Sequence, residues 1–560
     1  MQGKKNYTEK LFLSFQLSDR VPEDNLYRRL RESLDLSFLY KDTKELYGRT
    51  GNPSIDPVVF FKLLLTGYLE NVTSDRKLVE HCSMRMDVLY FLGYDLDEEL
   101  PWHSTISRTR QLYPASLFEK LFGKVFALCV DSGMVSGHTQ AVDSAPIKAN
   151  ASMESVVPKM PANPIGDHLK KVSEENAETT KKQVGPASPA HISAPEHELK
   201  RVEKHHQNLR DSPVRLVGAS HKKARLLSNK THYNPRDPDA RISVKPGKAR
   251  KLNYHCSMAV DTAEGVISHI QADFADGRDS QYLTDIGLKV QNRLRKNELI
   301  MTDFLADAGY SNGANYNFLE RRKVTGWIPV FGKYKPEIKG FPYNREKDEY
   351  RCPMDRPLPF KGFSTNKDGS VLKNYWAAPR DCKACPMKPQ CAPKTKSKKI
   401  ARTVYDEQYL RAYARQHSER GKQMKKLRQS TVEPVFGSLT QFYGLRKIGV
   451  LGKAGAHKVM LMAAIAFNLK KYLKKGGRRP SFGIFRTILD SLKGCLTIFS
   501  PQIQPRPVLF KTPYKQPTRV DILFLDHFCN GHERFMNLID FRYSSLISFD
   551  IIIGFPKFIR

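Results

Sequence analysis

The chain has 560 residues, and Lys plus Arg exceed Asp plus Glu by 92 to 58, a formal net charge of +34 at pH 7. Such an excess predicts a polyanionic partner, nucleic acid first, because phosphate neutralisation dominates that kind of binding. Nine Cys argue against a disulfide scaffold, the start MQGKKNYTEK lacks a signal-peptide core, and no charge-free apolar run reaches the roughly 20 residues that span a bilayer. We therefore expect a soluble, basic protein of the cytoplasm with no membrane partner.

Residues 1–135 predict a helical domain. The stretch IDPVVFFKLLLTGYLE from Ile55 places Asp56 as N-cap and Pro57 at the first helical position, where a missing N–H costs nothing. A second helix is expected from Ser74. A third is expected in WHSTISRTRQ, capped by Ser104 or Thr105.

That third helix is basic and rich in hydroxyl groups, so the region resembles a helix-turn-helix arrangement in which Arg108 and Arg110 contact DNA. An ordinary bundle with a solvated last helix has the same composition, and both interpretations stay open. Residues 117–130, LFEKLFGKVFALCV, have helical periodicity and lead towards Asp143.

Residues 151–250 predict a flexible basic insertion, because Lys, Pro, Ala, Ser and Asn dominate and apolar periodicity is weak. A short charged helix is expected over residues 194–206. Its three histidines invite a metal-binding interpretation, but solvent exposure is favoured because the stretch is mostly charged. Residues 222–225 and 241–251 are basic clusters that either contact phosphates or are simply solvated. The histidines are His197, His205 and His206.

An α/β pattern begins at Tyr254. YHCSMAVD and GVISHIQADF predict a β-hairpin, a helix follows from Asp279, and LIMTDFLAD predicts a strand ending at Asp307. TGWIPV, from Thr325, is a further short strand. Together these elements predict a mixed sheet flanked by helices, with residues 136–330 forming the first part of an α/β domain.

Residues 331–400 form a separate insertion with turns, charges and four cysteines. The two-residue gap between Cys382 and Cys385 is typical of a zinc knuckle, and Cys352 and Cys391 would complete a four-thiolate site. The remaining gaps are irregular, so reduced thiols without a metal are the alternative.

Residues 401–476 predict helices again and the last part of the catalytic domain. Glu433 lies in RQSTVEPVFG, where Pro434 disfavours helical geometry at Glu433, so we expect a helix boundary or kink there. A long apolar-faced helix from Ala456 is expected in the core. Residues 477–560 are a Phe-rich extension without sustained periodicity and of unknown role.

Three acids therefore come from different local settings. Asp143 lies in HTQAVDSAPI, a short β-type run that is expected to end at Pro146. With Asp307 and Glu433 it could form a site for Mg²⁺, which prefers a few carboxylates plus water and phosphate oxygens. The alternatives to Asp307 are Asp303, on the same strand face, and more weakly Asp261 and Asp273.

The order of AVDSAPIKAN from Ala141, LADAGYSN from Leu305 and TVEPVFGSL from Thr431 resembles the bacterial insertion-sequence transposases of the DDE class, over roughly residues 20–475. The resemblance includes the subgroup with a Cys-containing insertion between the second Asp and the Glu. It implies an RNase H-like fold in which Asp143, Asp307 and Glu433 hold two Mg²⁺ or Mn²⁺ ions. It further implies double-stranded DNA as partner, at element ends and target, a homodimer or larger assembly on DNA, and a place near the nucleoid.

The chain departs from this family around the Glu. Relatives often carry Arg four residues before it and Lys seven after it, where this chain has Gln429 and Thr440. Arg428 is one residue away and is expected to contact DNA instead, while Gln441 has no charge. A nuclease that only hydrolyses DNA, and an impaired DNA-binding relic, are the alternative functions.

Overall fold

The computed structural model describes residues 14–48, 54–161, 192–210, 227–243, 250–332, 334–366 and 369–475. The predicted C-terminal extension, most of the predicted basic insertion and the basic cluster at 222–225 lie outside these residues. Among the described residues, no helix is both long and apolar enough to cross a membrane.

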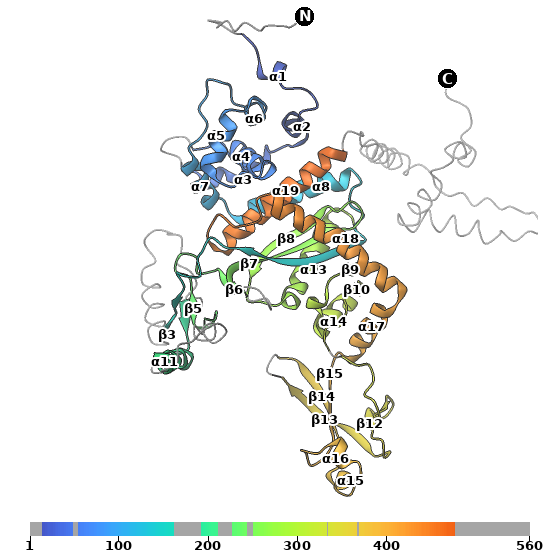
Figure 1. Cartoon of the computed structure of the whole chain (residues 1–560). Coiled ribbons are helices and arrows are strands. Elements are labelled where there is room, and N and C mark those ends of the chain that lie inside the picture. The colour runs from blue at the N-terminus through green and yellow to red at the C-terminus, as the bar shows by residue number, and fades with distance from the viewer. Residues whose placement is uncertain are drawn as a thin grey trace, which may run out of the picture. The chain divides into compact units, whose positions relative to one another are not determined.

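Every regular element from residue 14 to residue 131 is helical in the described chain (Figure 1). In chain order these elements are α1 (Leu17–Arg20), α2 (Leu26–Ser33), α3 (Phe38–Thr43), η1 (Lys44–Leu46), α4 (Pro57–Leu69), α5 (Asp75–Ser83), α6 (Met86–Leu92), α7 (His103–Leu112) and α8 (Ala115–Asp131).

Helix α4 confirms the predicted start. The Asp56 carboxylate accepts hydrogen bonds from the N–H groups of Val58 and Val59, and Pro57 is the first helical residue. Ser74 does precede α5, but its side chain makes no capping hydrogen bond. Helix α7 begins at His103 and has Trp102 as its N-cap residue. It therefore starts before Ser104 and Thr105, the two predicted caps.

The central sheet has six strands in the order β10-β9-β1-β7-β6, with β8 also paired to β7. Pairs β1–β9 and β9–β10 are parallel, whereas β7 is antiparallel to β1, β6 and β8, so the predicted mixed sheet and its hairpin are confirmed. The strands are β1 (Thr139–Lys148), β6 (Arg241–Ser243), β7 (Lys251–Asp261), β8 (Ile267–Phe274), β9 (Asp303–Leu305) and β10 (Thr325–Trp327).

Strand β1 continues through Pro146 to Lys148, so the predicted end at Pro146 is wrong. Strand β9 pairs with β1 only from Thr139 to Ala141, and no described strand covers that edge of β1 at Pro146. An open edge tolerates a residue that has no N–H to donate.

Helices cover both faces of this sheet (Figure 1). Helices α8, α18 and α19 pack on one face, and α13 and α14 pack on the other. The expected helices at 117–130, from Asp279 and from Ala456 are all confirmed. Their bounds, with α17, are α13 (Asp279–Lys296), α14 (Gly313–Arg321), α17 (Asp406–His417), α18 (Glu419–Phe442) and α19 (Gly452–Lys475).

One core cluster joins the N-terminal helices to the sheet. It contains Phe60 of α4, Phe122 of α8, Met258 of β7 and Leu461 of α19, all of which are fully buried. The described helical segment and the sheet therefore share a core rather than burying separate ones.

Residues 331–403 hold a second sheet, which the sequence did not predict. It is an antiparallel meander in the order β11-β12-β13-β14-β15, and two short helices lie between β14 and β15. The elements are β11 (Tyr343–Asn344), β12 (Glu349–Arg351), β13 (Pro357–Thr365), β14 (Val371–Trp376), α15 (Pro379–Lys383), α16 (Lys388–Cys391) and β15 (Lys399–Thr403). We call this region the insertion sheet.

The described part of residues 151–250 is sparse. Two small sheets pair β2 with β5 and β3 with β4, and the expected charged helix is present as α11, although it begins and ends later than predicted. The bounds are β2 (Val157–Pro158), β3 (Met160–Pro161), β4 (Ser193–Ala194), α11 (Glu196–Arg210) and β5 (His232–Tyr233).

Candidate active site

Strand register brings the first two acids together. In the parallel pair of β1 with β9, Thr139 lies opposite Asp303 and Ala141 opposite Leu305. Two residues further along each chain, Asp143 and Asp307 follow at the same level, just beyond the end of β9. Each of these residues is four positions from the first pair, which explains how separate sequence segments converge.

Asp307 caps a turn rather than ending the strand. Strand β9 stops at Leu305, and the Asp307 carboxylate accepts a hydrogen bond of 2.9 Å from the Gly309 N–H at the start of η2 (Ala308–Tyr310). A Cβ on Gly309 would lie 3.0 Å from Asp307 Oδ1, so the glycine leaves room for the carboxylate.

Helix α18 supplies the third acid. Alternation along β1 turns Asp143 to the face of Ala141, which is the face that α18 covers through Val432. The Arg428 guanidinium lies 2.9 Å from Asp143 Oδ2 and 3.6 Å from Glu433 Oε1, so one cation joins the two acids.

Arg428 is largely buried, with 11% of its side chain exposed, and it faces these two carboxylates. The sequence suggested a DNA phosphate as its partner. The structure gives it a carboxylate partner instead, because α18 packs this side of the helix onto β1.

Helix α18 runs from Glu419 to Phe442 with Pro434 inside it. Glu433 is therefore not at a helix boundary, and the other expected geometry, a kink, stays a prediction. Proline at this place removes one N–H of the helix ladder. The Pro434 carbonyl accepts a hydrogen bond of 2.9 Å from the Ser438 hydroxyl, and Glu433 stays on the helix surface with 57% of its side chain exposed.

Burial makes both aspartates harder to ionise. Desolvation raises the pKa of Asp143, which the Asp307 charge also raises, while the Ser144 N–H and the Arg428 guanidinium oppose the shift. Desolvation likewise raises the pKa of Asp307, and the nearest charge that adds to the effect is Asp279. A cation placed between these groups would relieve the repulsion.

Asp279 is a fourth acid at this place, and sequence reasoning missed it. Asp279 is the first residue of α13. Its carboxylate accepts a hydrogen bond of 2.8 Å from the Ser144 hydroxyl and lies 3.2 Å from His255 Nε2. A Cβ on Gly309 would lie 2.7 Å from Asp279 Oδ2 and 3.0 Å from Asp307 Oδ1, so the two carboxylates crowd one glycine. The sequence marked Asp279 only as a helix start.

A buried hydroxyl lies beside the same acids. Tyr310 is fully buried, and its Oη makes no hydrogen bond within the described chain. Desolvation raises the pKa of Tyr310 well above its usual value, and the charges of Asp279, Asp143 and Asp307 raise it further. An unmatched buried donor next to anions marks a place where a ligand oxygen could be received.

The alternative acids have other partners. Asp303 accepts a hydrogen bond of 2.6 Å from Trp327 Nε1, and it lies at the start of β9, four residues before Asp307. Asp261 accepts from the N–H groups of Ser136 and Gly137 and closes the turn before β1. Asp273 accepts from Ser257 and Gln271 in a separate network.

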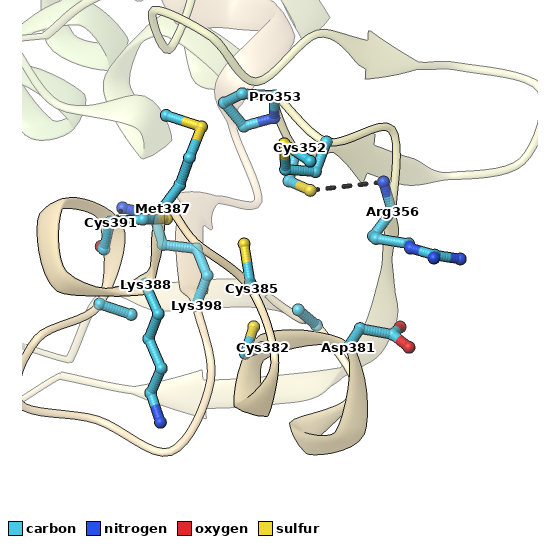
Figure 2. A pocket seen from close by; sticks show the side chains of 13 residues that line it. Cys352, Pro353, Arg356, Asp381, Cys382, Cys385, Met387, Lys388, Cys391 and Lys398 are labelled. Carbon is cyan, nitrogen blue, oxygen red and sulfur yellow. Dashed lines mark hydrogen bonds between the residues drawn. The ribbon is translucent and has the colours of Figure 1, made fainter.

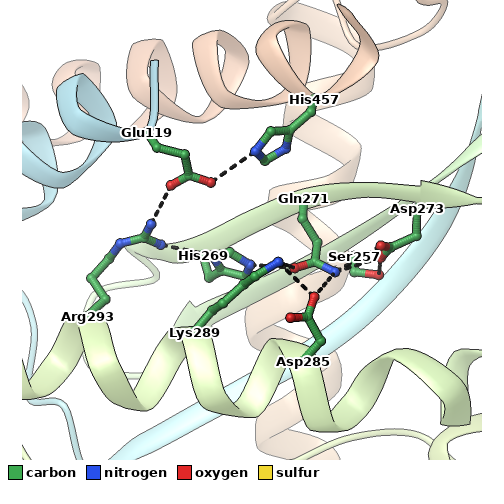
Figure 3. A network of polar contacts seen from close by, with 9 residues as sticks. All are labelled: Glu119, Ser257, His269, Gln271, Asp273, Asp285, Lys289, Arg293 and His457. Carbon is green, nitrogen blue, oxygen red and sulfur yellow. Dashed lines mark hydrogen bonds and ion pairs between the residues drawn. The ribbon is translucent and has the colours of Figure 1, made fainter. Parts of the chain in front are cut away.

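That network is the second large polar group of the catalytic sheet (Figure 3). Glu119 of α8 pairs with Arg293 of α13 at 2.6 Å and with His457 of α19 at 3.0 Å. It continues through His269 to Gln271 on β8, and Lys289 pairs with Asp285 at 2.7 Å. Burial opposes ionisation of Glu119, but His457 and Arg293 lower its pKa to about 2.

The carboxylate oxygens around Asp143 are ligands that a hard cation prefers. Arg428 contacts Asp143 and Glu433, and His255 lies beside Asp279, so the four carboxylates outnumber these two basic side chains. In the described residues, no three or more His, Cys, Asp or Glu side chains stand in metal-binding geometry.

The four cysteines of the insertion line one cavity of about 30 Å³ (Figure 2). Cys352 directly follows β12. Cys382 lies in the last turn of α15, Cys385 lies just after that helix, and Cys391 is the last residue of α16. Burial raises the pKa of the Cys391 thiol, Lys398 opposes this, and each of the other three cysteines raises it further.

The predicted DNA contacts of the N-terminal region separate in the structure. Arg108 is exposed on α7. Arg110 turns inward and forms two hydrogen bonds, of 2.9 and 2.6 Å, with the Asp75 carboxylate, tying α7 to α5. The geometry therefore leaves Arg108 as the residue of the two that faces solvent. The histidines of α11 join no described metal-binding group.

Two family models match the chain. A transposase domain (DUF772) matches residues 15–112, the helices up to α7, and a transposase DDE domain matches residues 351–473, which include Glu433 and all four insertion cysteines. No curated protein matches the chain. Both matches are to transposase models, and in this order they support an insertion-sequence DDE transposase.

Proposed function

We propose that the protein cleaves DNA at the ends of an insertion sequence and joins those ends to target DNA, with Asp143, Asp307 and Glu433 as the catalytic acids. The observation that carries this proposal is the Arg428 bridge from Asp143 to Glu433, together with the position of Asp307, whose charge raises the pKa of Asp143. The mixed sheet with helices on both faces agrees with an RNase H-like catalytic domain, which we include in the proposal.

Two Mg²⁺ or Mn²⁺ ions held by these acids would activate a water or 3′-hydroxyl and stabilise the leaving oxygen of an in-line displacement at phosphorus. The carboxylates are negatively charged and partly shielded from solvent. This environment favours the binding of a divalent cation. Asp307 is oriented by the Gly309 N–H and Asp143 by the Ser144 N–H, at 2.9 and 2.8 Å.

Other side chains around these acids hold them in position and do not take part in the reaction. Arg428 fixes Asp143 relative to α18, and Ser144 fixes Asp279 through its hydroxyl. The Tyr310 hydroxyl is placed to donate to an oxygen of a bound phosphate or water, because it has no partner among the described residues. Glu433, the most exposed acid, is where DNA would reach the site.

DNA binding follows from charge as well as family. The net charge of +34 suits a double-stranded DNA partner, and the exposed Arg108 on α7 is the proposed phosphate contact of the N-terminal helices. Joining needs two element ends in one complex, so we include a homodimer or larger assembly on DNA in the proposal.

The test uses labelled DNA that carries the two flanking ends of the gene, with Mg²⁺ or Mn²⁺. We compare the wild type with Asp143→Asn, which keeps the side-chain volume, and with Asp276→Asn, a nearby acid that pairs with Arg241 at 3.6 Å. The expected result is end-specific nicking and joined products, lost by about 1000-fold or more in Asp143→Asn and retained in Asp276→Asn.

Other outcomes identify the rival functions. Cleavage without joined products would make the protein a nuclease. Tight DNA binding without cleavage in any variant would make it a relic, and the first suspects are then Gln429, which is exposed, and Thr440, whose hydroxyl donates to Phe436 and Gly437 carbonyls. Cleavage by Asp143→Asn at the wild-type rate would refute the acid assignment.

A further inference from the structure

The insertion sheet has a small core of its own. Its buried cluster holds only six hydrophobic residues, and three of the four cysteines pack against it. A core of that size supports little stability without a cross-link or a metal. The cluster residues are Phe341, Tyr350, Leu358, Tyr375, Ala377 and Ile400.

All four thiols of the insertion converge where three chain segments meet (Figure 2). Cys352 comes from the turn after β12, Cys382 and Cys385 from α15 and its end, and Cys391 from α16, and each of them lines the same cavity. The Cys385 N–H donates to the Cys382 carbonyl, so the two thiols stand on one tight turn. The volume of about 30 Å³ is large enough for one ion.

We propose that Cys352, Cys382, Cys385 and Cys391 bind one structural Zn²⁺ ion that staples β12 to α15 and α16. Four thiolates form the closed coordination of structural zinc, whereas the hard carboxylate site would take Mg²⁺. The proposal concerns the insertion sheet alone and does not depend on the proposed DNA chemistry.

Binding converts four thiols to thiolates and releases four protons to solvent, so the zinc-tetrathiolate centre carries a net charge of −2. Charged residues that line the cavity include Lys398 and Asp381, while the Lys388 side chain extends away from the thiols (Figure 2). The Lys398 ammonium donates to the Cys391 carbonyl. The Arg356 N–H donates to Cys352 Sγ at 3.3 Å, so one sulfur already has a backbone donor.

The sulfurs line the cavity without closing into a metal-binding group. An ion would therefore draw the four thiols inward from these positions. This predicts a measurable tightening of the insertion sheet on metal binding.

The test measures zinc in the full chain purified without chelator and without added metal. The expected content is about one zinc per chain in wild type and in Met387→Leu, which lines the same cavity but has no thiol. Cys82→Ser, a thiol in the N-terminal core, should also keep zinc. Cys352→Ser and Cys385→Ser should lose it.

Cobalt gives a second readout that does not require activity. Replacement of zinc by Co²⁺ in wild type should give the thiolate-to-cobalt and ligand-field bands of a tetrahedral sulfur site, weakened when Cys385 is replaced. Limited proteolysis should cut residues 353–398 faster after zinc removal. Asp143→Asn should retain full zinc, which separates this proposal from the catalytic one.

Three results would overturn the proposal: wild type without zinc and without cobalt bands, zinc content unchanged by both cysteine substitutions, or disulfides among the four cysteines in freshly purified protein. If a single serine variant fails to fold, the Met387→Leu protein and cobalt titration of wild type still decide the question.

Discussion

The acids around Asp143 and the network around His269 are both buried polar groups on the catalytic sheet, yet they balance charge differently. In the network, Glu119 meets Arg293 and His457, and Asp285 meets Lys289, so each of these acids has a cation within 3.0 Å. Around Asp143, four carboxylates share the Arg428 guanidinium and, when it is protonated, His255. In the network, each of these acids is paired with a cation of the chain. The four carboxylates around Asp143 need further positive charge to be balanced.

This difference separates structural from functional polar groups without any appeal to sequence motifs. A saturated network stabilises the fold and loses stability when one member is removed. A group of acids with too few cations is destabilised by charge repulsion, which the binding of a cationic ligand relieves. Substitutions in the two places should therefore move different observables.

The largest expected effect on stability is at Arg293. Arg293→Met leaves Glu119 buried without its main cation and should cost about 3–5 kcal/mol in the free energy of unfolding. The measurement is urea unfolding followed by circular dichroism. Arg295→Met, on the exposed side of the same helix, is the matched control and should change stability little.

A double variant sharpens this expectation. Glu119→Gln with Arg293→Met should cost less than the sum of the single substitutions, because the two side chains contact each other at 2.6 Å. Strict additivity would show that the pair does not interact in solution.

Asp279 should behave in the opposite way. Asp279→Asn removes one of the four carboxylates around Asp143, and we expect cleavage activity or Mg²⁺ affinity to fall by about 10–100-fold, with unfolding stability unchanged or raised. Cleavage rates across a Mg²⁺ titration measure this, with Asp276→Asn as control. If Asp279→Asn lowers stability and leaves activity unchanged, Asp279 has only a structural role at the start of α13.

The network should also make the fold sensitive to acid. Burial first, and then the Arg293 charge, lower the pKa of His269 from its usual 6.5 to about 3. The unfolded chain therefore binds more protons than the folded one between these values, so stability is fully present above pH 6.5 and falls as pH drops towards 3.

We expect the loss from His269 to be on the order of 1–2 kcal/mol between pH 6.5 and pH 5. His269→Gln has no proton to bind and should flatten this part of the stability profile measured by urea unfolding. Glu119, whose pKa is lowered from 4.5 to about 2, adds a further loss only below about pH 4.5, so of these two groups His269 alone gives the slope between pH 6.5 and 4.5. A profile with the same slope in both proteins would refute the assignment.

The sequence predicted elements where local patterns suffice and failed where packing decides. Asp56 and Pro57 start α4 by local chemistry, and the hairpin of β7 with β8 follows from alternation. Of the two geometries expected beside Pro434, a helix boundary does not occur, because α18 packs on β1 and continues through the proline despite the loss of one helix hydrogen bond.

The candidate site shows the same division. Short motifs predicted Asp143, Asp307 and Glu433 as the site, and in the structure Arg428 joins Asp143 to Glu433. Asp279 was missed, because it looks like any acidic residue in a first helical turn. Its role follows only from Ser144 and Gly309, which are distant in sequence.

The smallest expected effect distinguishes two arginines of α7 that are alike in the sequence. Arg108 is exposed, so Arg108→Gln should weaken DNA binding severalfold and reduce the salt dependence by about one phosphate contact, with unchanged unfolding. Arg110 is bound to Asp75, so Arg110→Gln should cost on the order of 1–3 kcal/mol of stability before it affects DNA. Binding isotherms at several salt concentrations, paired with thermal melts, separate the two. If Arg110→Gln changes the salt slope while its melt stays at wild type, the inward pair with Asp75 opens on DNA, and the helix presents both arginines to phosphate.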